Sequence, residues 1–395
     1  MKHLATYLII FIVFSGFTQK NKSSKLNPEV YVKEIPFNFE YGIPIIKATI
    51  KNKEYNFLFD TGMPTALSEN IIKDFDLSSV RSTIGSDVNG NKQRENYVIL
   101  DHINIGGIDF KNIETLTVDL NSGFEIGCLN LDGVIGNNLI KNAVWEIDYV
   151  RNVIRLTNDI DNFEIPNDAK KIRFKYNSRR NQYTPKVDIE INNKKSKNVF
   201  FDTGSNSGIK MPLKQYEKLL DPNQSVEYYG NSSAALYGKG KYIKYIDSKI
   251  KNIEIDGLKL QNEIVTFYDN SSLIGNKFLK NFRIILNYER SEIYMIRQKE
   301  SIYTFVKNFG FHPSVNNNKA IVQIIFKNSV AKKKGLQLGD ELLSVNSMNI
   351  PKLLSEDACS FIFDNPYSEL DSISLTFARD GKEYLIDLEK ETYIN

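Results

Sequence analysis

Two short acidic motifs are the parts of this sequence best suited to chemistry. The first is Asp60-Thr61-Gly62, and the second, Asp202-Thr203-Gly204-Ser205, begins 142 residues later. Each follows an apolar run, at residues 57–59 and 199–201. A positioned carboxylate can act as a general acid or base. Asp60 and Asp202 are therefore the candidate catalytic groups.

Histidine is too scarce to support most other kinds of active site. The 395 residues include three histidines, and His3 falls in a segment with the features of an export signal. His102 and His312 alone are thin material for a zinc site or for a chain of histidine catalysts. The net charge of +3, from 51 basic and 48 acidic residues, creates no field that would indicate a nucleic acid partner.

The N-terminus has the layout of a secretory signal peptide. Lys2 precedes an apolar run over residues 4–17, with Ser15 and Gly16 near its end. A basic start, a short apolar core and a small-residue exit are typical of such signals, and the run is shorter than the ~18–20 residues that span a bilayer. We expect removal of residues 1–19 on export to a periplasmic or extracellular location, with no membrane span left. An uncleaved N-terminal anchor is the alternative.

The two cysteines, Cys128 and Cys359, are far apart in the sequence. They are separated by 231 residues and fall in different predicted domains. Small buried thiols are common in protein interiors. We therefore expect two separate buried thiols rather than a disulfide, and no local motif supports a Cys128–His102 nucleophile pair.

An internal repeat organises most of the chain. The sequence Gly133-Val134-Ile135-Gly136-Asn137 follows the first acidic motif, and Leu273-Ile274-Gly275-Asn276 follows the second at a similar interval. Matched landmarks in one order indicate duplicated units. Within each unit, short β-branched runs alternate with polar turns, which predicts strands and hairpins. The sequence therefore predicts two all-β lobes with a few short helices.

Residues 31–297 resemble the aspartic protease family, which includes pepsin-like and retropepsin-like enzymes. The resemblance rests on the two Asp-Thr-Gly motifs and the later apolar-apolar-Gly strands. It implies a two-lobed acid-protease β-barrel fold in which each lobe supplies one catalytic aspartate. The supporting loop residues would be Thr61, Gly62, Thr203, Gly204 and Ser205.

The resemblance also implies a mechanism. Two carboxylates about 3 Å apart cannot both ionise, so they share one proton. One can then activate a bound water while the other acts as acid toward the scissile carbonyl oxygen. The expected reaction is peptide hydrolysis without a covalent intermediate, a metal or a cofactor.

The two copies differ after the glycine, where lobe 2 has Ser205 and lobe 1 has Met63. If the Ser205 hydroxyl donates to Asp202, Asp60 is the more readily protonated partner and Asp202 the more anionic. Two segments are candidate flaps over the site. Residues 85–96 contain the tight-turn signal Asn89-Gly90, and residues 229–240 contain Tyr237.

Residues 301–390 resemble a PDZ domain, a small α+β fold. The resemblance rests on Phe309-Gly310-Phe311 and on the Ser-x-Ala-x-x-x-Gly-Leu-x-x-Gly-Asp pattern at residues 329–340. In this family the apolar-Gly-apolar loop offers backbone N–H groups to the terminal carboxylate of a peptide that adds as a strand. Phe309, Gly310 and Phe311 are therefore the predicted peptide-binding residues. The alternative is a module that only packs on the protease.

These observations predict four segments: a signal peptide at residues 1–19, protease lobes at 20–160 and 161–299, and a PDZ domain at 300–395. We expect a monomer, because both half-sites occur in one chain, which disfavours a retropepsin-like homodimer. The expected function is an exported aspartic endopeptidase that acts on peptide or protein substrates and binds C-terminal peptides at its PDZ domain. The alternative is a catalytically inactive peptide-binding or scaffold protein of the same fold.

Overall fold

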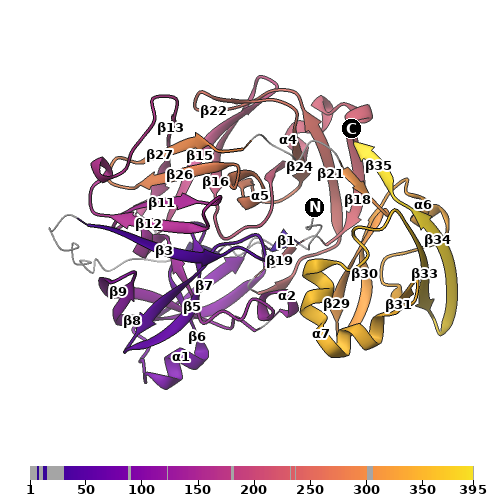
Figure 1. Cartoon of the computed structure of the whole chain (residues 1–395), viewed down its shortest axis with the longest axis horizontal. Helices are drawn as coiled ribbons and strands as arrows, with labels where there is room; N and C mark the ends of the chain where they lie inside the picture. Colours follow the sequence, from indigo (N-terminus) through magenta and orange to yellow (C-terminus); the bar gives the residue numbers. More distant parts are fainter. Residues whose placement is uncertain are drawn as a thin grey trace.

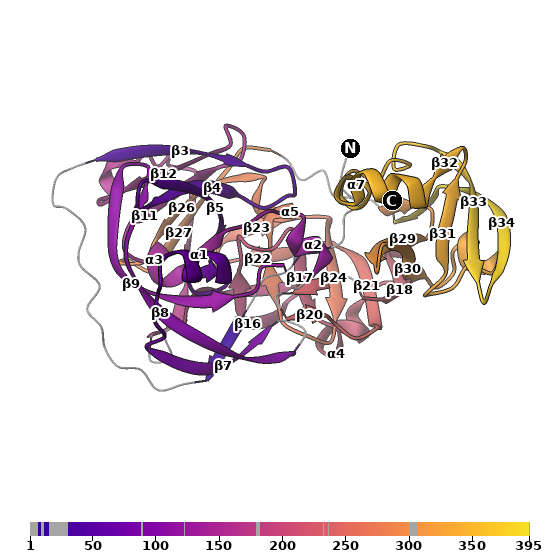
Figure 2. The ribbon, with the colours of Figure 1, turned by 90° about the horizontal axis from the view of Figure 1, so that it is seen from below.

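The computed structural model describes residues 7–8, 12–15, 31–87, 90–121, 123–178, 182–231, 233–235, 237–299 and 306–394. Most of the described residues lie in β-strands, which confirms the predicted all-β class. Figures 1 and 2 show two strand-rich lobes side by side and a smaller C-terminal module at one end, against the second lobe.

Lobe 1 alternates strands with tight turns and short helices. Lys51 and Asn52, the turn between its second and third strands, both have positive φ, as tight hairpin turns require. The elements are β3 (Val32–Asn38), β4 (Ile45–Ile50), β5 (Lys53–Asp60), β6 (Ala66–Ser68), α1 (Glu69–Asp74), β7 (Arg81–Asp87), β8 (Lys92–Ile105), β9 (Ile108–Val118), α2 (Phe124–Gly127), β10 (Gly133–Gly136), α3 (Asn137–Ile140), β11 (Val144–Asp148) and β12 (Val153–Thr157).

Lobe 2 repeats this arrangement. Its first long hairpin turns at Asn192 and Asn193, again with positive φ. The elements are η1 (Ile160–Asn162), β13 (Lys170–Arg173), β14 (Lys175–Asn177), β15 (Gln182–Ile191), β16 (Lys194–Phe201), β17 (Ile209–Pro212), α4 (Leu213–Tyr216), η3 (Glu217–Leu219), η4 (Pro222–Gln224), β18 (Ser225–Gly230), β19 (Ser233–Ala235), β20 (Gly238–Lys239), β21 (Ile243–Ile250), β22 (Ile253–Ile255), β23 (Leu258–Leu260), β24 (Glu263–Tyr268), β25 (Leu273–Ile274), α5 (Asn276–Leu279), β26 (Phe282–Asn287) and β27 (Glu292–Arg297).

A shared sheet joins the two lobes. β11 of lobe 1 pairs antiparallel with β26 of lobe 2, from Val144 opposite Asn287 to Asp148 opposite Arg283. Trp145 on β11 is fully buried in a core cluster that contains residues of both lobes. The lobes therefore form one folded body with the acidic motifs at its centre.

The C-terminal module is a small sheet with two helices. Its elements are β28 (Val306–Asn308), β29 (Phe311–Asn316), β30 (Lys319–Phe326), α6 (Val330–Lys333), β31 (Glu341–Val345), β32 (Met348–Asn349), α7 (Ile350–Asp364), β33 (Ser372–Arg379), β34 (Lys382–Glu389) and β35 (Glu391–Ile394). β30 pairs with β18 of lobe 2, with Tyr228 opposite Phe326. The module therefore extends the sheet of lobe 2.

A disulfide fastens the module to lobe 1. Cys128, directly after α2, is bonded to Cys359 on α7, and their Cα atoms are 5.5 Å apart. The expectation of two separate thiols was wrong, because packing of the module against lobe 1 brings together residues that are 231 positions apart. Sequence separation does not limit which residues tertiary packing makes neighbours.

Two short N-terminal strands lie within the predicted signal segment. β1 (Tyr7–Leu8) pairs with β19 of lobe 2, and β2 (Ile12–Ser15) pairs antiparallel with β7 of lobe 1. The rest of residues 1–19 lies outside the described part of the chain. Among the described residues, no helix has the length and apolarity needed to cross a membrane.

Candidate active site

The two acidic loops begin where two central strands end. β5 ends at Asp60, and Asp202 directly follows β16. The apolar-apolar-Gly strands run parallel beside them, with Gly136 opposite Asp60 and with the Asp202 N–H donating to Ile274 O at 3.0 Å. Each aspartate is therefore held between the ends of two buried strands.

Reciprocal hydrogen bonds between two threonines join the loops. The Thr61 N–H donates to the Thr203 hydroxyl at 3.0 Å, and the Thr203 N–H donates to the Thr61 hydroxyl at 3.1 Å. Each hydroxyl in turn donates across to the other lobe, Thr61 to Phe201 O at 2.6 Å and Thr203 to Phe59 O at 3.0 Å. This network fixes the two loops in a symmetric arrangement.

The glycines after the threonines let the carboxylates approach. A Cβ at Gly62 would lie 2.7 Å from Asp202 Oδ1, and a Cβ at Gly204 would overlap the Asp60 carboxylate. Instead, the Gly62 N–H donates to Asp60 Oδ1 at 2.6 Å and the Gly204 N–H donates to Asp202 Oδ1 at 2.9 Å. Any side chain at either glycine would push the aspartates apart.

Two buried asparagines support the loops from behind. Asn276 Nδ2 donates to Thr203 O at 2.6 Å, and its Oδ1 accepts from the Tyr149 hydroxyl at 2.7 Å. Asn137 Nδ2 donates to the Thr184 hydroxyl at 3.0 Å, which donates to Gly62 O at 3.0 Å. No role was predicted for these asparagines from the sequence. The signal was present in the repeat, where each directly follows a matched glycine.

Burial and mutual repulsion dominate the electrostatics of the pair. Asp60 and Asp202 are fully buried. Burial, followed by the negative charge of Asp202, raises the pKa of Asp60 well above its usual value. Burial raises the pKa of Asp202 to about 7, against the opposing effects of the Gly204 N–H and other donors. A proton therefore remains on the pair at pH values where exposed aspartates are ionised.

The Ser205 hydroxyl does not have the role predicted for it. It lies 2.7 Å from the Ser207 hydroxyl, and it accepts from the Ser207 N–H at 3.3 Å. Among the described residues, the Ser205 hydroxyl does not donate to Asp202, because it is bonded to Ser207 within its own loop. In lobe 1, Met63 is buried in a hydrophobic cluster.

The two candidate flaps contact each other. β7 and β8 form the lobe 1 hairpin, with Ser86 opposite Lys92, while Asn89 lies outside the described residues. The Tyr237 N–H of lobe 2 donates to Asp87 Oδ2 at 3.2 Å. Burial raises the pKa of Glu95, on β8, to about 7. The hairpins therefore meet through polar groups.

The predicted peptide-binding loop of the C-terminal module is largely buried. Phe309 and Phe311 are buried, and the N–H of Gly310 donates to Asn308 Oδ1 at 2.6 Å. Beside this loop, α2 of lobe 1 lies next to β29 and α7 (Figures 1 and 2). Ser314 on β29 donates to Glu125 of α2 at 2.6 Å, and the neighbouring Cys128 is bonded to α7. The segment 125–128 therefore bridges β29 and α7.

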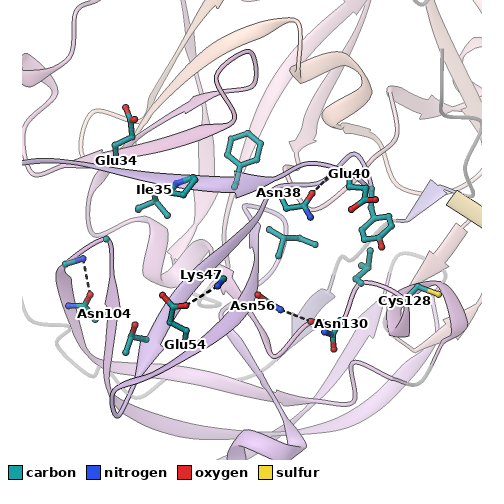
Figure 3. Close-up of a pocket in the computed structure, with 18 residues that line it drawn as sticks. Glu34, Ile35, Asn38, Glu40, Lys47, Glu54, Asn56, Asn104, Cys128 and Asn130 are labelled. Atoms are coloured by element: carbon teal, nitrogen blue, oxygen red, sulfur yellow. Dashed lines mark hydrogen bonds and ion pairs between the residues drawn. The ribbon is translucent and has the colours of Figure 1, made fainter. Parts of the chain in front are cut away.

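A separate cavity of about 800 Å³ lies on lobe 1 along β3, β4 and β5 (Figure 3). Its lining combines apolar side chains, such as Ile35 and Phe37, with carboxylates, including Glu34, Glu40 and Glu54. Lys47 forms an ion pair with Glu54 at 3.1 Å within it. None of its lining residues comes from the acidic loops, so it forms no part of the aspartate site.

The comparison with known families agrees with this geometry. A family model described as aspartyl protease matches residues 46–139, which include the first acidic motif and the first apolar-apolar-Gly strand. The match supports an aspartyl protease family, and hence the general class of proteases, for this part of the chain. No curated protein matches the sequence.

Proposed function

We propose that the protein is an exported aspartic endopeptidase that hydrolyses peptide bonds by direct attack of water on the scissile carbonyl. The observation that carries this proposal is the reciprocal Thr61–Thr203 bonding, which holds two buried carboxylates against each other. The second carboxylate oxygens, Asp60 Oδ2 and Asp202 Oδ2, are buried and have no hydrogen-bond partner among the described residues. Unpaired buried oxygens are costly, so they are suited to bind water and substrate.

The proposed reaction needs one proton on the pair. The ionised aspartate removes a proton from the water as its oxygen attacks the carbonyl carbon, and the protonated aspartate donates its proton to the carbonyl oxygen. Collapse of the tetrahedral intermediate then breaks the C–N bond, with a proton passed to the leaving amine. The raised pKa of Asp60 favours Asp60 as the acid and Asp202 as the base.

An extended peptide is the substrate shape that the site favours. β2 of the chain's own N-terminus pairs with the outer edge of β7, and β1 pairs with β19. Both candidate flaps thus accept extended backbone as an added strand. We propose that removal of residues 1–19 on export leaves these edges to a substrate. A disulfide is characteristic of oxidising compartments, which supports export.

We further propose that the C-terminal module is a PDZ domain that binds the C-terminus of a substrate or partner peptide. Its order of strands and helices and the loop at Phe309, Gly310 and Phe311 support this assignment. In the structure, segment 125–128 of lobe 1 is bonded both to β29 and to α7. The module therefore also packs on the protease, and peptide binding requires this contact to open.

The test is a digest of a proteome-derived peptide library across a range of pH with the full chain lacking residues 1–19. We expect cleavage that a statine-type inhibitor blocks and that falls at least ~10²-fold in Asp60→Asn and Asp202→Asn. Equal cleavage by these variants would refute the aspartate mechanism. Inhibitor and peptide binding without cleavage by the wild type would favour a scaffold protein.

A further inference from the structure

The two lobes place different residues at equivalent positions beside the acidic loops. In lobe 1, Val134 of β10 pairs with Ala66 of β6, Ala66 pairs with Leu116 of β9, and Leu116 pairs with Tyr97 of β8. These residues belong to one hydrophobic cluster. Side chains in register across a sheet share a face. Lobe 1 therefore lines this face with apolar groups.

The same series of strands in lobe 2 carries charges. Leu273 of β25, like Val134, stands two residues before the glycine of its apolar-apolar-Gly strand. It pairs with Lys210 of β17, Lys210 pairs with Thr266 of β24, and Thr266 pairs with Asp247 of β21. Lys210 and Asp247 thus occupy the positions of Ala66 and Tyr97.

Lys210, Thr266 and Asp247, here called the polar row, are all buried. Lys210 has no exposed surface, and its Nζ lies 5.3 Å from the centre of the Tyr268 ring. Asp247 Oδ1 accepts from the Thr266 hydroxyl at 2.6 Å and from the Tyr228 hydroxyl at 3.1 Å. Burying charged groups is costly, and lobe 1 uses apolar groups at these positions. Folding alone therefore does not require the charges of Lys210 and Asp247.

Lys210 lies on the same side of the sheet as Asp202 and interacts electrostatically with it. Leu273 pairs both with Lys210 and with Phe200 of β16. Phe200 is two residues before Asp202, and side chains two residues apart on a strand point to the same face. Lys210 is thus on the face of the sheet toward which Asp202 points.

We propose that Lys210 is a positioning residue that holds the negative charge of the dyad on Asp202 and the shared proton on Asp60. The proposal rests on the proposed protease function, since it assigns base and acid within that site. In this proposal Lys210, rather than the Ser205 hydroxyl, is the reason why Asp202 is more readily ionised than Asp60. No equivalent cation stands at Ala66 beside Asp60.

The surrounding charges agree with this assignment. Asp202 interacts electrostatically with Asp60 of lobe 1, with Lys210 of β17 and with the Tyr268 hydroxyl of β24. Lys210 lowers the pKa of Asp202, in opposition to burial. Burial lowers the pKa of Lys210 itself to about 7, with Asp247 and Asp202 opposing the shift. The pKa of Lys210 and the pKa of Asp202 are both about 7, so the cation and the Asp202 anion coexist near this pH, and the cation is lost at higher pH.

Two further basic groups lie behind the polar row. Lys277 of α5 faces Asp247, and burial lowers the pKa of Lys277 to about 7. His312 of β29 faces Lys277, and burial lowers its pKa to about 4. Asp247 therefore has a second cation available, so removal of Lys210 does not leave it without a basic partner.

The test is a titration of the dyad that does not depend on turnover. Aspartate carboxyl carbons labelled with ¹³C are followed by NMR across pH in the full chain, with Asp60→Asn and Asp202→Asn used for assignment. In the wild type we expect Asp202 to titrate in the lower step. In Lys210→Met we expect this step to move up by about one pH unit, and in Lys214→Met, an exposed control, we expect no change.

A second variant keeps the proposal testable if Lys210→Met does not fold. Lys210→Met/Asp247→Asn removes both charges, and we expect a smaller upward shift, because loss of the Asp247 charge opposes that of Lys210. If the chain cleaves peptides, the acidic limb of kcat/KM moves with the same step. An unchanged dyad titration in folded Lys210→Met, or in the double variant if Lys210→Met does not fold, overturns the proposal. A shifted titration in a chain that cleaves no peptide refutes only the protease function.

Discussion

Thr61 and Thr203 each donate a backbone N–H to the other's hydroxyl, at 3.0 and 3.1 Å, across the boundary between the lobes. Their hydroxyls also donate to Phe201 O and Phe59 O. Four hydrogen bonds of this kind tie the end of each central strand to the other lobe. The distance between the aspartates is therefore set by a buried network rather than by the aspartates themselves.

Replacing Thr61 with valine tests this network. The change keeps the side-chain shape but leaves the Thr203 N–H and Phe201 O without their partners, and a buried unsatisfied group costs about 1–3 kcal/mol. We expect a corresponding loss in the free energy of unfolding, measured with urea, and a larger fractional loss of kcat/KM. Thr117→Val is the matched control, because the Thr117 hydroxyl has no hydrogen-bond partner among the described residues. Equal effects of the two changes would contradict the role of the network.

The raised pKa of Asp202 predicts how stability depends on pH. Its folded-state pKa of about 7 exceeds the ordinary aspartate pKa of 3.8, so between these values the folded state binds more protons than the unfolded state. The contribution of Asp202 to stability is thus present at low pH and is lost as the pH rises toward 7. Asp202→Asn removes this dependence.

We therefore expect Asp202→Asn to gain stability relative to the wild type as the pH rises from about 4 to about 7. The gain should be at least ~1.4 kcal/mol, the value of one unit of pKa. Urea unfolding at several pH values measures it. Asp188→Asn is the control, because Asp188 is exposed. A stability difference that stays constant over this range would show that Asp202 is not protonated in the folded state.

The pairing of the acidic loops could be predicted because each motif carries its own local signal. Asp-Thr-Gly after an apolar run predicts a strand that ends in a tight loop. The second copy of this motif predicts a second half of the same site. The Asn137 and Asn276 supports follow matched glycines, so the repeat contained their signal as well. What the repeat could not supply was their partners, Thr184 on β15 and Tyr149 in the turn after β11.

Lys210 shows why other features could not be predicted. It lies between Ile209 and Met211, and a lysine in such an alternating run usually points to solvent. It is buried because β24 and β21 place Thr266 and Asp247 beside it, and this depends on strand order. The disulfide between Cys128 and Cys359 depends in the same way on where the C-terminal module packs.

Met63→Ser separates two explanations for the asymmetry of the dyad. The Ser205 hydroxyl is bonded to Ser207 rather than to Asp202, so a serine at position 63 has no reason to donate to Asp60. We expect the acidic limb of the pH profile to stay in place. Because Met63 is fully buried, we also expect a loss of about 2–5 kcal/mol in the free energy of unfolding. If the acidic limb of the pH profile moves to lower pH in Met63→Ser, a hydroxyl group after the glycine does set the difference between the two aspartates.

The disulfide between Cys128 and Cys359 predicts redox control of the C-terminal module. Segment 125–128 is attached to β29 through Ser314–Glu125 and to α7 through the disulfide. We expect these two contacts to prevent a peptide from adding between β29 and α7. Reduction removes the covalent contact, and loss of a native disulfide costs about 2–5 kcal/mol. We therefore expect reduction to expose the space in which a peptide strand would add.

Fluorescence polarisation of a labelled peptide library with free C-termini measures this effect. We expect binding to rise on reduction of the wild type and to be high without reductant in Cys128→Ser/Cys359→Ser. Two controls define the mode of binding. Amidated peptides should bind poorly, because the Phe309-Gly310-Phe311 loop would contact a free carboxylate, and Ser314→Ala should add to the effect of reduction because it removes the second contact. Equal binding by the oxidised wild type and the double serine variant would show that segment 125–128 does not block the module.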